Sequence, residues 1–175
     1  MLTVNNLVGF GTLVGSIAPY RFLRLHITAQ VGTTVTRSTI REIDFSADGG
    51  ATWLPSTAMT SNTAPSPLVA SADSEFSATY STWKAFDNVA TGDNLWISAE
   101  TAFPHWITID LGAGNAISPN RFRYTNWVSG SDDRTLKDFT ILGSNTGTFS
   151  GEQATLLTKT GEPGQADATT ITYMI

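Results

Sequence analysis

The chain has 175 residues, of which 41% are hydrophobic and 14% charged, with a formal net charge of −5. This apolar content suits one folded domain and argues against disorder, and the missing basic run argues against nucleic-acid and electrostatic membrane partners. The sequence contains no cysteine, which rules out disulfides, thiolate nucleophiles and cysteine-based zinc sites.

The first 19 residues are mildly apolar, and glycines interrupt their apolar run at residues 7–15. The segment lacks the basic opening of a signal peptide, and no stretch of the chain reaches the ~20 apolar residues that a membrane span needs. We therefore predict an N-terminal arm at residues 1–19 that packs on a neighbour, followed by a domain at residues 20–175.

Alternation of apolar and polar residues with period two predicts β-strands along this domain. In residues 20–28, Leu23, Leu25 and Ile27 share one face, and in residues 40–46, Ile43 and Phe45 do so. Residues 76–94 mix aromatics with turn formers and predict irregular structure with one helical turn. Short strands divided by Gly, Pro and Asn turns are typical of an all-β sandwich. Further strands are predicted at residues 106–111, 121–127, 138–143, 154–159 and 169–175.

Residues 46–53 read SADGGATW, which matches the Asp-box pattern Ser-x-Asp-x-Gly-x-Thr-Trp of sialidases. In those enzymes the motif is a hairpin device that lies away from the chemistry. The chain is too short for a propeller and has a single copy. We therefore predict a structural hairpin in which Asp48 accepts hydrogen bonds from the amides of its own turn and Trp53 packs beneath it.

Three segments between residues 71 and 147 carry a likeness to a known family. Residues 83–88 read WKAFDN and precede Trp96, residues 104–112 read PHWITIDLG, and residues 137–145 read KDFTILGSN. In this order and spacing they resemble the discoidin family, also called the coagulation factor V/VIII type C domain, which bacterial and phage carbohydrate-binding modules share. The resemblance implies a galactose-binding-like fold, an antiparallel jelly-roll β-sandwich.

The order of the strands departs from the family pattern. Segments like residues 20–25 and 40–43 usually close the family's domain at its C-terminal end, whereas here they come first. Because domain termini often lie close together, a permuted order is physically sensible, and it predicts that these strands pair beside the final one at residues 170–175. The alternative is a chain that straddles two modules. This order also resembles domains of phage tail and virion proteins.

The resemblance further implies a structural Ca²⁺ site. Asp87 and Glu42 match the family's ligand positions, and Asn94 or Thr91 would supply another oxygen. Calcium takes six to eight oxygen ligands, several of which can be backbone carbonyls. Asn88 replaces the family's usual glycine, and the loop that follows is longer than the common form. In the alternative interpretation Asp87 caps a turn and Glu42 pairs with an arginine such as Arg123.

Ligand binding is expected at the loop after residue 127. Sugars stack their apolar face on an aromatic ring while carboxylates or guanidinium groups bind their hydroxyls. The candidate ligand-binding residues are Trp127, Asp132, Asp133, Arg134 and Tyr80. The alternative for Trp127 is ordinary packing at a strand edge. Trp83, Trp96 and Trp106 match core positions of the family and are expected to be buried.

No nucleophile elbow, zinc-protease motif or phosphate-binding loop occurs, so we expect no enzymatic activity. Two functions remain, and they are compatible. One is a phage virion component, in the tail or as a decoration protein, that docks on other virion proteins or copies of itself and binds host glycan. The alternative is a carbohydrate-binding module of an extracellular bacterial protein. The first places the chain in the virion, the second outside the cell.

Overall fold

The computed structural model describes residues 18–33, 35–130 and 132–175. The predicted arm therefore lies outside the described residues, apart from Ala18 and Pro19. Strands make up 40% of the described residues and helices 5%, which confirms the all-β prediction. Within these ranges, no helix is long and apolar enough to cross a lipid bilayer.

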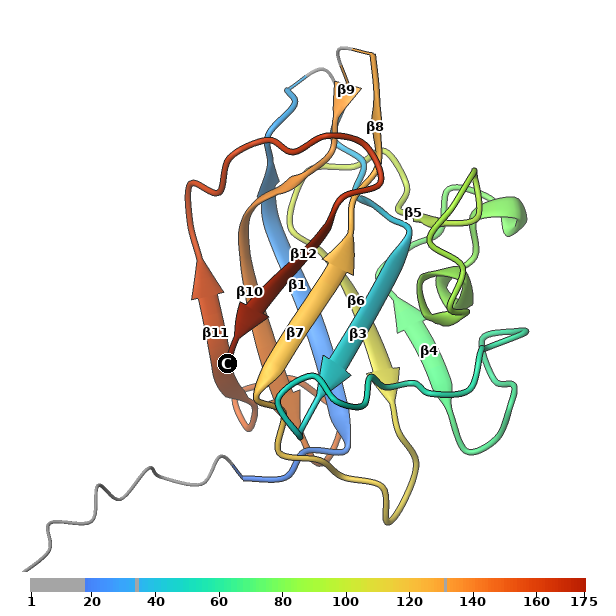
Figure 1. The fold of residues 1–175 in the computed structure, drawn as a ribbon, viewed down its shortest axis with the longest axis vertical. Helices are drawn as coiled ribbons and strands as arrows, with labels where there is room; N and C mark the ends of the chain where they lie inside the picture. Colours follow the sequence, from blue (N-terminus) through green and yellow to red (C-terminus); the bar gives the residue numbers. More distant parts are fainter. Residues whose placement is uncertain (1–17, 34, 131) are drawn as a thin grey trace, which may run out of the picture.

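The larger sheet has five strands, and every neighbouring pair in it is antiparallel. The first described strand, β1, lies at its centre and pairs with one strand on each side (Figure 1). In spatial order the sheet contains β11 (Ala154–Lys159), β10 (Leu136–Ser144), β1 (Phe22–Gln30), β6 (His105–Asp110) and β4 (Val69–Ala72).

A three-stranded antiparallel sheet lies in front of the larger one in Figure 1, with β7 between its two partners. Its order is β12 (Thr170–Met174), β7 (Arg121–Thr125) and β3 (Glu42–Ser46). The remaining elements are two short strand pairs and two 3₁₀ helices. They are β2 (Thr39–Ile40) with β5 (Trp96–Ile97), β8 (Val128–Ser129) with β9 (Asp132–Asp133), η1 (Ala78–Tyr80) and η2 (Thr82–Phe86).

The core lies between the two sheets and follows from the period-two alternation of their strands. Phe139 of the larger sheet contacts Phe122 and Tyr173 of the smaller one, with ring centroids 6.0 and 5.4 Å apart. Ile107 and Ile141, predicted to face inward, are at most 1% exposed. The predicted sandwich character is thus confirmed, with both inner faces apolar.

The predicted pairing of the first strands with the last one is wrong. The last strand, β12, pairs with β7, and β3 occupies the opposite edge of β7. Strand β1 belongs to the other sheet altogether. A strand has only two edges, and β7 uses both of them, so β3 and β12 are next-nearest neighbours instead of partners.

The hairpin at residues 46–53 forms as predicted. The amide of Thr52 donates to Asp48 Oδ1 at 2.9 Å, and the amide of Gly50 donates to Ser46 Oγ at 2.9 Å. Gly50 has a φ of 97°, and a Cβ built there would lie 3.3 Å from the ring of Trp53. Hydrogen bonds from the Thr52 amide and the Ser46 hydroxyl lower the pKa of Asp48 to about 2. The motif is therefore a turn that fixes the end of β3.

Candidate functional site

Three of the predicted ligand-binding residues come together at the β8–β9 hairpin. The Arg134 guanidinium lies over the ring of Trp127, with its carbon 4.6 Å from the ring centroid. The same guanidinium donates two hydrogen bonds to Asp132 Oδ2, at 2.8 and 2.5 Å. A third bond goes to Thr39 Oγ1 at 2.8 Å. The three residues therefore form one preorganised group at the end of the sandwich.

The side chains of the other two predicted residues are engaged elsewhere, although Asp133 belongs to the same hairpin. Asp133 accepts a hydrogen bond from the amide of Thr135 at 2.9 Å, and its own carbonyl accepts one from Gly32. It therefore fixes the local turn. Tyr80 belongs to η1, and its aromatic neighbour is Phe76, with a centroid distance of 6.3 Å. A role of these residues in ligand binding stays a prediction.

The expected calcium ligands Glu42, Asp87 and Asn94 do converge. The amide of Val89 donates to Glu42 Oε2 and to Asp87 Oδ1, at 3.0 Å in each case. Asn94 donates its side-chain amide to the other oxygen of Asp87. Thr91 is exposed and stays outside this set of contacts. The bond from Val89 to Asp87 also shows that Asp87 caps the turn.

Burial makes this group electrostatically unusual. Glu42 is 5% exposed, and its pKa is raised to about 9, first by burial and then by the negative charges of Asp44 and Asp87. Burial also raises the pKa of Asp87 and of Asp44. The expected alternative pairing is wrong, because Arg123 donates to Asp44 Oδ2 at 2.7 Å and not to Glu42.

The fit of this group to a cation can be judged from its oxygen atoms. Glu42 Oε1 and Asp44 Oδ1 are buried and lack a hydrogen-bond partner among the described residues. Both residues line a cavity of about 200 Å³ with Asn88 and Thr170. In the part of the chain that the structure covers, no three His, Cys, Asp or Glu side chains are arranged to hold a metal ion. A Ca²⁺ bound by Glu42 and Asp87 would thus need amide and backbone oxygens as well.

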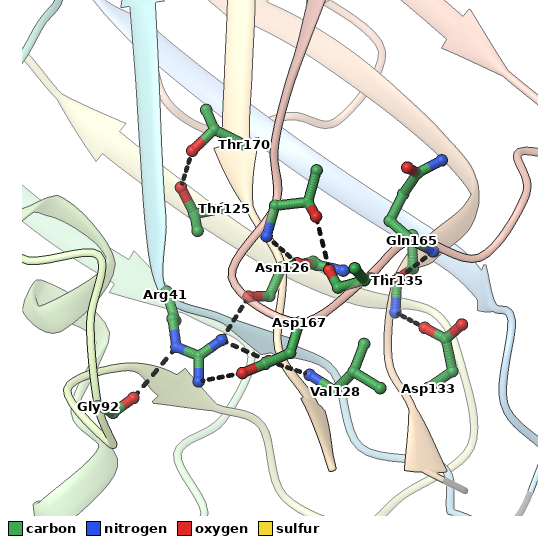
Figure 2. Close-up of polar contacts among 12 residues, drawn as sticks. Arg41, Gly92, Thr125, Asn126, Val128, Asp133, Thr135, Gln165, Asp167 and Thr170 are labelled. Atoms are coloured by element: carbon green, nitrogen blue, oxygen red, sulfur yellow. Dashed lines mark hydrogen bonds and ion pairs between the residues drawn. The ribbon is translucent and has the colours of Figure 1, made fainter. Parts of the chain in front are cut away.

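A second polar network, which sequence reasoning missed, ties the loops around this cavity together (Figure 2). Arg41 donates to Gly92 O at 3.1 Å, to Asn126 O at 2.9 Å and to Asp167 at 2.6 and 3.2 Å. Asn126 is fully buried and accepts a hydrogen bond from the amide of Thr169 at 2.8 Å. The loop that carries Asp87 and Asn94 is thus anchored to the segment before β12.

His105 forms a buried ionic contact between two loops. Its Nδ1 lies 2.8 Å from Asp73 Oδ2, and its Nε2 lies 2.7 Å from Thr36 O. Thr36 O and the Asp73 carboxylate accept hydrogen bonds, so both contacts are satisfied together when both ring nitrogens donate, that is, in the protonated ring. Burial alone would lower the pKa of His105, but these bonds outweigh burial and raise it. The contact joins β6 to the segments around Asp73 and Thr36.

The three tryptophans expected in the core have different environments. Trp96 is fully buried, and Trp83 is partly buried against the core. The prediction for Trp106 is wrong, because its ring is half-buried and lies on the outer face of the five-stranded sheet, opposite His26 of β1. In β6 the alternation points Ile107 and Ile109 inward, so Trp106 must point outward.

An apolar pocket of about 400 Å³ opens beside the start of the described chain. The backbone of Tyr20 exchanges hydrogen bonds of 2.7 and 3.1 Å with that of Ile117, at the edge of this pocket. Half of the residues that line it are proline or leucine, among them Leu54, Pro55, Pro65, Pro67 and Leu68.

Comparisons with known proteins find no match for this chain among family models, curated proteins or solved structures.

Proposed function

We propose that this chain is a non-enzymatic virion component, a phage tail or decoration protein, whose discoidin-like jelly-roll domain docks a neighbouring subunit. The observation that carries the proposal is the apolar pocket next to Ile117, with its volume of about 400 Å³. Exposed concave apolar surface of this kind marks interaction sites. The low proportion of charged residues, 14%, leaves little charge to repel a neighbouring copy.

We assign the pocket to the N-terminal arm, residues 2–18, of a neighbouring copy. The arm is apolar enough to fill such a pocket, because its run at residues 7–15 includes two leucines, two valines and a phenylalanine. Within one copy, the first described residues lie on the side of Tyr20 that is away from the pocket. The bridge between Tyr20 and Ile117 is antiparallel, so Pro19 lies beside Ser118 and not beside Ala116, which lines the pocket.

Molar mass in solution tests this proposal. We expect the full chain to associate and a chain that lacks the first 18 residues to be a monomer. Ala116 is exposed and lines the pocket, so Ala116→Arg should abolish association without touching the core. Ala113→Arg is the matched control, since Ala113 is exposed on the same loop outside the pocket. Equal masses for the full and shortened chains would refute arm-mediated docking, and so would association that survives Ala116→Arg.

Glycan binding is a second candidate function, favoured by the group of Trp127, Asp132 and Arg134. It combines a half-buried aromatic ring with a carboxylate and a guanidinium, the chemistry that recognises sugars. Trp127→Ala should abolish binding to uncharged glycans on an array and leave the melting curve nearly unchanged. Trp53→Ala is the control, because Trp53 is also stacked under an arginine, Arg123 at 4.1 Å. Undiminished binding by Trp127→Ala would remove this group from the site.

A further inference from the structure

The outer face of the five-stranded sheet carries an arginine between two aromatic rings. The guanidinium carbon of Arg24 lies 3.9 Å from the centroid of Trp106 and 3.7 Å from that of Phe149. Trp106 comes from β6, and Phe149 comes from the turn between β10 and β11. His26 lies two residues along β1 on the same face, opposite Trp106. Three segments distant in the sequence thus build one surface around Arg24.

The hydrogen-bonding capacity of Arg24 is only partly used. Its Nε donates to Thr108 Oγ1 at 2.8 Å. Its two terminal nitrogens have no partner among the described residues, yet they are not sealed inside the protein. Five other arginines each have an ion pair with a carboxylate, whereas Arg24 has none within the described ranges. Those pairs are Arg21–Asp110, Arg37–Glu100, Arg41–Asp167, Arg123–Asp44 and Arg134–Asp132.

The surroundings of Arg24 leave its positive charge poorly compensated. Burial lowers the pKa of Arg24 to about 10, and the charge of Asp73 opposes this shift. Asp73 is already engaged by His105 and by the amide of Trp106. Burial and the Arg24 charge together lower the pKa of His26. An anion beside Arg24 would therefore relieve an unfavourable field that the protein itself does not neutralise.

We propose that Arg24, between Trp106 and Phe149, binds the carboxylate of an acidic sugar on the outer face of the five-stranded sheet. A guanidinium edge matches a carboxylate through two parallel hydrogen bonds, and the stacked rings hold this edge in place before the ligand arrives. The rings offer apolar surface to the C–H groups of a sugar, and His26 can bond a hydroxyl. One guanidinium suits a singly charged carboxylate better than phosphate, which favours several cations.

This site lies on a sheet face, away from the β8–β9 hairpin. It goes beyond the glycan-binding candidate at that hairpin, because it is a separate site with a ligand class of its own, and it is independent of docking through the arm. The molar-mass experiment can therefore fail while this site holds, and the reverse is equally possible.

NMR titration of the full chain tests the site. Glucuronate, glucose, acetate and inorganic phosphate are added in turn, and the His26 ring signals and the Arg24 side-chain signal are followed. We expect glucuronate to shift both signals and to raise the pKa of His26, since it places a negative charge nearby. Acetate should bind more weakly because it lacks the ring, and glucose should leave the pKa of His26 unchanged.

Variants separate the effect of the bidentate guanidinium edge from the effect of its positive charge. Arg24→Lys keeps the charge but loses the bidentate edge, so we expect glucuronate affinity to fall at least about tenfold. Arg121→Lys is the matched control, because Arg121 lies on the outer face of the other sheet. Phe149→Leu, on an exterior turn, should weaken glucuronate binding severalfold and leave acetate binding unchanged.

Three results would each overturn the proposal. The first is the absence of any shift at His26 and Arg24 with glucuronate, and the second is equal affinity for glucose and glucuronate. The third is tighter binding of phosphate than of glucuronate, which would indicate a general oxyanion site.

Discussion

Replacing Glu42 by Gln should change the pH dependence of stability in a defined direction. In metal-free buffer the folded chain holds a proton on Glu42 up to a pH of about 9, whereas the ordinary pKa is 4.5. Between these values the folded state binds one more proton than the unfolded state. The stability from this proton is complete below pH 4.5 and is lost as the pH rises through about 9.

The magnitude follows from the proton count. One extra proton in the folded state lowers the free energy of unfolding by about 1.4 kcal/mol per pH unit. At pH 7, which is 2.5 units above the ordinary value of 4.5, the loss amounts to about 3 kcal/mol. Glu42→Gln has no such proton, so its advantage over the parent protein should grow with pH. Since Gln brings its own unpaired amide hydrogens, the difference in slope is the informative quantity.

Urea unfolding at several pH values between 5 and 8, with a chelator present, measures both slopes. Glu100→Gln is the control, because Glu100 is largely exposed and should leave the slope unchanged. Parallel profiles for the parent protein and Glu42→Gln would refute a protonated Glu42. Millimolar Ca²⁺ should raise the melting temperature of the parent protein and flatten its profile, while Glu42→Gln should not respond. An unchanged melting temperature of the parent protein in Ca²⁺ would refute the predicted calcium site.

Phe139→Ala, which empties the aromatic contact between the sheets, should destabilise the fold by about 3–5 kcal/mol in urea unfolding; a loss under 1 kcal/mol would contradict tight packing there. His105→Gln should remove the part of the stability that the parent protein loses as pH rises from 6.5 through the raised pKa of His105, read from melting curves across that range. Ser46→Ala deletes the bonds to Asp48 and Gly50 and should cost about 1–2 kcal/mol, whereas Ser56→Ala, on an exposed loop, should cost little.

The strands with large alternating side chains could be predicted from the sequence. Residues 154–159 form β11 with the predicted bounds, and the inward faces of β1 and β6 are those that the pattern indicates. Strand β4 was missed because its sequence, VASA, has small residues and only Ala70 is buried. Period two tells which residues share a face, but a short edge strand without large side chains gives no such signal.

The pattern also says nothing about what covers an outer face. Glu42 and Asp44 alternate with Ile43 and Phe45 as predicted, yet all four are buried, because the loop after Asp87 and the side chain of Arg123 cover the outer side of β3. The convergence of Glu42 and Asp87 was expected through family resemblance alone. No local pattern relates two residues so far apart in the chain.

The Arg24 stack depends on sheet register in the same way. Arg24 meets Trp106 and Phe149 only because β1 lies between β6 and β10 with a fixed alignment. The aromatic and basic residues are visible in the sequence, but their meeting requires the strand order, which is the part that the sequence pattern leaves open.

The central position of β1 has a consequence for folding during synthesis on the ribosome. Arg24 and its partner Thr108 are 84 residues apart, and Thr28 and Asp138 are 110 apart. At about 5–20 residues per second, β1 emerges several seconds before either neighbour exists. During that time Leu23, Leu25 and Ile27 have no sheet to join, and only long-range closure can bury them. A chaperone that holds extended apolar segments would therefore meet β1 before either of its partner strands.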